Sequence, residues 1–196
     1  MIVVQVSILC VLVVLLVVRR VSRPGPGPVV PVDASYDRRT AVRPSLIPGA
    51  GDGLFVVEPI ASGEVVGELG GQLIANDAGA ADNHYLVTLH ECALEHTHPY
   101  TLLDSRELGG PVKRINFAPR TINGTETRLQ NAAIEARCEP PYVVFVALRD
   151  LHPGEEILAS YGSEYDYERF MYIPEVRQYF CARTSIDCSV AYAFEP

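Results

Sequence analysis

The hydrophobic pattern of the chain begins with a long apolar run, because residues 2–18 are apolar except for Gln5 and Ser7. As a helix, this run just reaches the length needed to cross a bilayer. Arginines follow the run and none precedes it, which favours a retained anchor over a cleaved signal peptide. We predict a hydrophobic transmembrane or signal-anchor helix over residues 1–20. The alternatives are a cleaved signal peptide, a misassigned start codon and a buried segment.

Residues 21–44 follow with alternating Pro and Gly and with no long apolar run. This composition prevents a helix and predicts an extended linker. The positive-inside rule places the chain beyond the arginines in the cytosol. We therefore expect a membrane-anchored protein whose cytosolic domain begins near Ser45, while a nuclear or secretory location stays open.

Two distant segments share one pattern of apolar strands around a Gly-Glu turn. They are LFVVEPIASGEVVGELGGQLI, from Leu54, and YVVFVALRDLHPGEEILASYG, from Tyr142. When Gly63 is placed on Gly154, Ile60 falls on Leu151. The pattern predicts two hairpins of one design and hence a sheet-built domain with pseudo-symmetric halves. Two ordinary hairpins without such a relation are the alternative.

The rest of the pattern also predicts short elements. The segments NHYLVTLH and PYTLLDS are plausible strands, and residues 163–180 predict a short helix broken at Pro174. A chain of 196 residues with 15 Gly and 15 Pro is long enough for one domain of short strands and turns. We therefore predict a mostly β fold.

Charge and cysteine content narrow the partners. A formal net charge of -8 excludes a sequence-independent grip on nucleic acid and suits a cationic partner such as a lysine-rich peptide. The five cysteines show no CxxC pair and no regular spacing, which argues against a disulfide framework and against a zinc site. The histidines have no partnered cysteines at ligand spacing, so we predict no metal.

Seven short motifs follow one another in a distinctive order. They are GAGDGLF, IASGE, YLVTL, LLDS, RINF, QN and RDLHPGEEILASYG. In this order they resemble the SET-domain protein lysine methyltransferases over about Ser45 to Tyr165. The resemblance implies a SET-domain β-clip-like fold of short strands and hairpins with a knot-like C-terminal segment. It assigns residues 45–165 to the SET domain and residues 166–196 to a segment that closes the substrate channel.

The resemblance also implies a cofactor, S-adenosyl-L-methionine, and a set of site residues. Tyr161 would be the catalytic tyrosine, and Arg114 to Phe117 would pass under the loop that carries it. Asp104 matches an acidic strand position whose role is structural or substrate-binding. The cofactor-binding residues implied are Ala50, Gly51, Asp52, Tyr85, Asn116, Phe117 and Tyr165, of which Tyr85 and Tyr165 line the lysine channel or cover the cofactor.

A tyrosine suits methyl transfer from a sulfonium, because the reaction is an in-line displacement that needs an aligned neutral amine. Free lysine has a pKa of about 10.4, and burial beside a positive sulfonium lowers it. A phenol can orient the amine, and carbonyl oxygens can accept weak contacts from the polarised methyl group. The reaction requires neither a metal nor a covalent intermediate.

The chain departs from the family pattern at several places. Phe117 stands where the family usually has His, Ser160 replaces an acidic residue, and PRTINGTETRL lengthens the stretch before Asn131. The cysteine-rich zinc segment of many histone-specific members is missing, since Cys181 and Cys188 have the wrong spacing. The last wall of the channel must then come from SEYDYERFMYIPEVRQYF.

From these observations we expect a protein-lysine N-methyltransferase that uses S-adenosyl-L-methionine. Its partner would be a lysine-bearing protein, with a histone as one candidate, and it would bind no nucleic acid directly. The alternative is a catalytically silent SET-like module that binds a basic peptide or the cofactor. A purely structural membrane protein is a third possibility. The oligomeric state is not indicated by the sequence.

Overall fold

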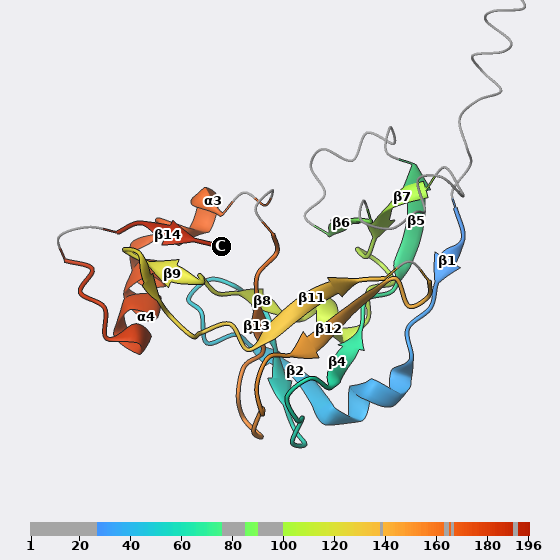
Figure 1. The fold of residues 1–196 in the computed structure, drawn as a ribbon, viewed down its shortest axis with the longest axis horizontal. Helices are drawn as coiled ribbons and strands as arrows, with labels where there is room; N and C mark the ends of the chain where they lie inside the picture. Colours follow the sequence, from blue (N-terminus) through green and yellow to red (C-terminus); the bar gives the residue numbers. More distant parts are fainter. Residues whose placement is uncertain are drawn as a thin grey trace, which may run out of the picture.

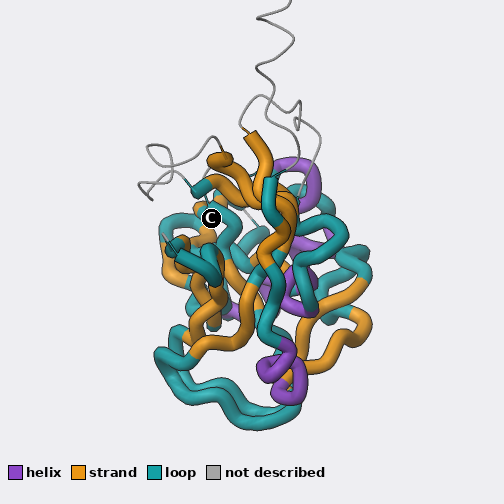
Figure 2. The backbone as a smooth tube through the Cα atoms, turned by 90° about the vertical axis from the view of Figure 1, so that its right-hand side faces the viewer, coloured by secondary structure: helices purple, strands orange, loops and turns teal. Residues whose placement is uncertain are grey.

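The computed structural model describes residues 27–75, 85–89, 100–137, 139–162, 165, 167–189 and 192–196. Over these residues the chain is built mostly of short strands joined by loops, with few helices (Figures 1 and 2). The mostly β fold predicted from the sequence is therefore confirmed. The hydrophobic helix predicted over residues 1–20 lies outside the described residues. None of the helices within them has the length and apolar character to cross a membrane.

In the described part of the chain, the strands form five small sheets. The largest has the order β1-β5-β7-β6, with all neighbours antiparallel. Its strands are β1 (Val29–Val30), β5 (Gly71–Ala75), β7 (Tyr100–Asp104) and β6 (Leu86–Thr88). A second sheet has the order β11-β12-β4, from Ala132–Ala136, Val143–Ala147 and Val65–Glu68. A third pairs β2 (Thr40–Pro44) with β3 (Asp52–Val56).

The two remaining sheets lie toward the C-terminal end of the molecule (Figure 1). In one, β8 (Asn116–Phe117) runs parallel to β13 (Leu158–Ala159). In the other, β9 (Thr121–Ile122) lies between β10 (Thr125–Glu126) and β14 (Phe194–Glu195). The helical elements are η1 (Ala34–Arg39), η2 (Pro111–Arg114), α3 (Glu168–Met171) and α4 (Pro174–Thr184). Pro174 is the first residue of α4 and separates it from α3, as the predicted helix break required.

The two segments of similar sequence are related by a pseudo-two-fold axis, and each segment hydrogen-bonds to the turn of the other. Ile60 and Leu151, which the alignment superposes, donate their N–H groups to each other's carbonyl at 3.1 and 2.8 Å. The end of β3 bonds to the second turn, with Val56 N to Glu155 O at 2.9 Å and Gly154 N to Val56 O at 2.8 Å.

The matching bonds recur at the first turn. Ala147 N donates to Glu64 O at 2.9 Å, and Gly63 N donates to Ala147 O at 2.8 Å. Since Ala147 corresponds to Val56 and Glu64 to Glu155, the two sets of bonds are equivalent. The predicted symmetry of the two segments is thus confirmed at their turns. The prediction of two separate hairpins is wrong, because β3 pairs with β2 and bridges to Glu156, while β4 pairs with β12.

Residues 29–44 differ from the extended linker that the sequence predicted. Val30 is buried, and β1 pairs with β5, while β2 pairs along its whole length with β3. The Asp33 side chain caps η1 by accepting from Ser35 N at 2.8 Å. Proline and glycine exclude a long helix here, but they permit short edge strands that complete sheets built from distant residues.

Two groups of buried apolar side chains hold these sheets together. The larger lies under the paired hairpins and contains Leu54, Ile60, Leu103, Leu151 and Ile157, each fully buried or nearly so. The second lies under the C-terminal helices and contains Ile47, Phe117, Ala118, Ile122, Leu158, Tyr167, Met171, Val176, Tyr179 and Phe180. Strands β8 and β13 contribute to the second group, so the C-terminal segment packs directly on this strand pair.

Replacing Leu151 tests the packing where the two hairpin segments meet. The Leu151 side chain is 0% exposed, so Leu151→Ala should lower the free energy of unfolding by about 3 kcal/mol through lost packing and a cavity. Urea denaturation measures the loss. The matched control is Leu148→Ala, because Leu148 is 53% exposed and its truncation should change stability by less than about 0.5 kcal/mol. Similar losses for both variants would contradict the assignment.

Candidate functional site

The parallel pair of β8 and β13 brings together two segments that are far apart in the sequence. Asn116 lies opposite Leu158 and Phe117 opposite Ala159, and Ala118 N continues the ladder by donating to Ala159 O at 3.2 Å. Because the strands run in the same direction, the residues after β13 lie near this short ladder. The Tyr161 hydroxyl thereby donates to the carbonyl of Ile115 at 2.5 Å.

The loop of Tyr161 is held by a neighbouring tyrosine. The hydroxyl of Tyr167 accepts from Tyr161 N at 2.9 Å and donates to Gly162 O at 2.7 Å. The ring of Tyr165 packs edge-on against the ring of Tyr161, with centroids 4.8 Å apart. Gly162 has a positive φ of 88°, a conformation that glycine adopts without a steric penalty. The backbone on both sides of Tyr161 is thus held in place.

Burial raises the pKa of Tyr161 well above its ordinary value, and the neighbouring tyrosines Tyr165, Tyr167 and Tyr85 raise it further. The phenol therefore stays protonated at neutral pH. Its proton is directed at the Ile115 carbonyl, so the hydroxyl oxygen keeps lone pairs that can accept a hydrogen bond. Such a group can orient a donor, whereas it cannot act as a base.

Phe117, the unusual residue of the predicted pocket, is 3% exposed. Its ring lies 4.1 Å from the Tyr167 ring and 5.7 Å from the Phe170 ring, measured between centroids. The side chain therefore belongs to the second core, beneath the C-terminal helices. With phenylalanine at this position, the backbone of β8 still pairs with β13. The Phe117 ring packs against the C-terminal segment.

The glycine turn lies beside Asn116. Gly49 and Gly51 both have a φ of 75°, and Ser45 N donates to Gly51 O at 2.8 Å across the turn. Ala50, Gly51 and Asp52 are exposed, although Ala50 N, Gly51 O and Asp52 O are already hydrogen-bonded within the protein. The side-chain amide of Asn116 donates to Asp52 O at 3.0 Å and joins the turn to β8. The structure thus brings these four predicted residues together.

Tyr85 and Asp104 lie at the ends of neighbouring strands. Tyr85 is partly exposed, and its carbonyl accepts from Ser105 N at 3.0 Å and from Ser105 Oγ at 2.8 Å. It is close enough to Tyr161 to affect that pKa, so it borders the same region. The Asp104 carboxylate accepts from Arg106 N at 3.0 Å and pairs with the Arg106 side chain at 3.1 Å. These contacts favour the structural role for Asp104.

Two buried polar side chains were not identified as site residues from the sequence. Glu156 is 6% exposed, and its carboxylate accepts from Ser45 Oγ at 2.6 Å, Leu46 N at 2.8 Å and Asn116 Nδ2 at 3.1 Å. Asn131 is 2% exposed, donates to Glu156 O at 2.9 Å and accepts from Leu158 N at 2.8 Å. Both occur in the quoted motifs, and the adjacent glutamates of PGEEI were the available signal.

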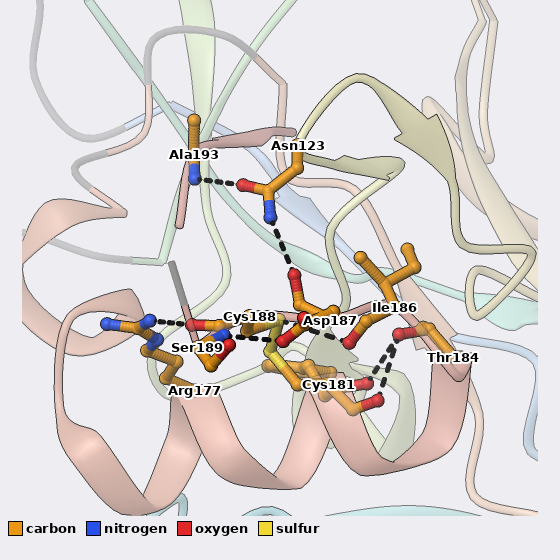
Figure 3. The surroundings of a disulfide bond; sticks show 10 residues. Asn123, Arg177, Cys181, Thr184, Ile186, Asp187, Cys188, Ser189 and Ala193 are labelled. Atoms are coloured by element: carbon orange, nitrogen blue, oxygen red, sulfur yellow. Dashed lines mark hydrogen bonds between the residues drawn. A yellow bond between two sulfur atoms is a disulfide. The ribbon is translucent and has the colours of Figure 1, made fainter. Parts of the chain in front are cut away.

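The C-terminal segment is closed by a disulfide between Cys181 and Cys188, which contradicts the expectation that the cysteines form no bridge (Figure 3). Helix α4 ends at Thr184, and Ser185 adopts a left-handed conformation with a φ of 57°. The chain then turns back, so that Cys188 lies beside Cys181. The spacing of the two cysteines does not encode the reversal of the chain after α4, which brings them together.

The loop that contains Cys188 also contacts the insert after β9. Asn123 donates to Asp187 O at 3.3 Å and accepts from Ala193 N at 2.8 Å (Figure 3). The Arg177 side chain donates to the carbonyl of Cys188 and lies over the ring of Tyr192, 5.0 Å from its centroid. The inserted loop and the C-terminal segment therefore support each other.

A surface cavity of about 530 Å³ opens beside this disulfide. Its lining includes Tyr172, Arg177, Cys181 and Ile186, and none of the predicted site residues. The predicted site residues instead gather around the β8 and β13 pair, where Tyr165 packs against Tyr161. The mutual geometry of these side chains, rather than the cavity, identifies the candidate site.

Two comparisons with known proteins each give a match. The model of the SET domain matches residues 51–162, more than half of the chain. Histone-lysine N-methyltransferase EZH2 of Chaetomium thermophilum is 26% identical over 129 residues, which are 62% of this chain and 8% of that protein. The chain thus spans a small part of the length of this relative.

The disulfide should stabilise the folded chain. Replacing both cysteines, as Cys181→Ser with Cys188→Ser, should lower the free energy of unfolding by about 2 kcal/mol under oxidising conditions, because a short closed loop is released in the unfolded state. Denaturation with and without a reductant measures this. The reductant should destabilise the parent chain and leave the double variant unchanged; a parent chain unaffected by the reductant would contradict the bridge.

Proposed function

Since this chain belongs to the SET-domain family of protein lysine methyltransferases, we propose that it transfers a methyl group from S-adenosyl-L-methionine to a lysine side chain of a protein. One observation carries the proposal more than any other. The buried hydroxyl of Tyr161 is held against the Ile115 carbonyl by a parallel strand pair, and so it has a fixed direction. A catalytic phenol that aligns an amine requires such a position.

The residues of the glycine turn and β8 fit the cofactor. The turn offers exposed backbone groups at Ala50, Gly51 and Asp52, without side chains at Gly49 and Gly51 that would keep a ligand away. Asn116 uses its amide N–H groups on Asp52 O and Glu156, which leaves its carbonyl oxygen for a ligand. These groups would hold the amino-acid portion, and the backbone around Phe117 would lie beside the adenine.

When bound, S-adenosyl-L-methionine would supply an electrophilic methyl group on a positively charged sulfur. Tyr161 orients the lysine: its proton is already donated to Ile115 O, so its oxygen accepts an N–H from the neutral amine. The lone pair of the amine is thereby left free to face the methyl carbon. The rings of Tyr165 and Tyr167 beside Tyr161 keep water from competing for this bond.

The substrate we propose is a basic protein, with a lysine of a histone as the first candidate. The name of the fungal relative states histone lysine as its substrate. The net charge of -8 on this chain agrees with a cationic partner, since opposite charges speed encounter. A catalytically silent module remains the alternative, motivated by Phe117 in place of histidine, and turnover separates the two.

Replacing Tyr161 tests the catalytic role. Tyr161→Phe removes the oxygen that would orient the amine, so the rate of methyl transfer to histones should fall by about 100-fold or more. Affinity for S-adenosylhomocysteine should be nearly unchanged, because the ring and its packing remain. Labelled-methyl transfer measures the rate, and calorimetry measures the affinity.

The matched control is Tyr172→Phe, since Tyr172 is 54% exposed and lies away from the strand pair. Its rate should equal that of the parent chain. Cofactor binding without any transfer by the parent chain, across histones and total lysate proteins, would favour the silent module. Absence of both cofactor binding and transfer would refute the proposed function.

A further inference from the structure

Glu156 is a buried carboxylate that touches no residue of the methyl-transfer step directly. It is 6% exposed, and among the described residues no basic side chain donates to its carboxylate. Burying a carboxylate is unfavourable unless hydrogen bonds replace its water. Here three donors do so: Ser45 Oγ, Leu46 N and Asn116 Nδ2. These donors come from the glycine turn and from β8, the two segments that would hold the cofactor.

The contact with Asn116 determines the direction of that side-chain amide. The Nδ2 atom of Asn116 donates to Asp52 O at 3.0 Å and to Glu156 Oε1 at 3.1 Å. Both partners accept through an oxygen atom, and the amide nitrogen can only donate. The amide must therefore point its NH₂ group toward them, which leaves the Asn116 oxygen on the opposite side.

The packing around Glu156 leaves its carboxylate little freedom. A Cβ atom placed on Gly53 would lie 2.3 Å from Glu156 Oε1, so only glycine lets the carboxylate sit at this depth. From behind, Asn131 donates to the carbonyl of Glu156 at 2.9 Å and fixes its backbone. The carboxylate is thus positioned from both sides before any ligand binds.

We propose that Glu156 is the positioning residue that sets the Asn116 amide so that its oxygen faces the α-ammonium of the cofactor. This inference rests on the proposed function, since it deepens the account of the same cofactor site. Without the carboxylate, only Asp52 O still accepts from the NH₂ group, so a turned amide that presents this group to the ammonium costs less. A donor facing a cation repels it, so the amino-acid portion would bind less well while the adenine portion would be unaffected.

Glu156→Gln tests this orientation. The backbone N–H of Leu46 cannot turn, so the glutamine oxygen should face it, and the new NH₂ group should face Asn116. Asp52 O then favours the original orientation of the Asn116 amide and the new NH₂ group favours the flipped one, so the flipped orientation should become populated. The probes are S-adenosylhomocysteine and its desamino analogue, which lacks only the α-amino group. The Kd for S-adenosylhomocysteine should rise about tenfold, while the Kd for the desamino analogue should change by less than about twofold.

Two further variants complete the experiment. Glu155→Gln is the matched control, because Glu155 is the adjacent carboxylate, faces the turn, and binds Arg149 and His152 N instead of Asn116; both Kd values should stay at the parent level. Gly53→Ala would place a Cβ atom 2.3 Å from Glu156 Oε1 and 3.3 Å from Asn116 Nδ2, so it disturbs the contact between the two side chains while keeping the carboxylate, and it should reproduce the selective loss. It also carries the test if Glu156→Gln does not fold.

Three results would overturn the inference. Equal losses for both ligands would mean that Glu156 only supports the fold. Unchanged affinity in folded Glu156→Gln and Gly53→Ala would mean that the amide does not depend on the carboxylate. If the parent chain binds neither ligand, the proposed function itself fails, and this inference with it; in the first two cases the parent chain binds and the proposed function stands.

Discussion

Strands β8 and β13 have two residues each, yet their parallel pairing brings Asn116 and Phe117 beside the segment that leads to Tyr161. So short a ladder makes few backbone bonds, and side chains supply the rest. Asn131 donates to Glu156 O and accepts from Leu158 N, which fixes β13 and the residue before it. Tyr161 closes the far end on the carbonyl of Ile115. Because these bonds are buried, breaking one would leave a polar group without water, and the pair is correspondingly rigid.

The pseudo-two-fold relation of the two segments explains how this pair is presented. Both copies bond through the same atoms at their turns, and Ile60 and Leu151 meet on the pseudo-two-fold axis. Beyond the turns the copies diverge. Val65 begins β4, which continues a three-stranded sheet with β12, whereas the corresponding Glu156 precedes β13 and faces Asn116. The segment from Leu54 thus completes the three-stranded sheet over the core, whereas the segment from Tyr142 carries the polar side chain that faces Asn116.

The C-terminal segment is held by aromatic packing and by a covalent bridge. Phe117 contacts Tyr167 and Phe170, which belong to the C-terminal segment. The residue that departs from the family pattern therefore also joins the candidate site to this segment. The disulfide and Asn123 hold the loop after α4 against the insert that precedes β11. The two unusual features of the sequence, the phenylalanine and the insert, therefore belong to one structural arrangement.

The sequence alone determined the features that depend on local chemistry and on motif order. Alternation and turn residues indicated the short strands, Pro174 marked the helix break, and the echo of one hairpin in the other predicted their symmetry. The ordered motifs identified the family and its candidate tyrosine. Only the tertiary structure decided what depends on long-range pairing. Residues 29–44 became edge strands because distant strands offered unpaired backbone groups. Cys181 met Cys188 because the chain reverses after α4. Glu156 acquired a role because folding brings Ser45, Leu46 and Asn116 around one carboxylate, and no local pattern encodes such a convergence.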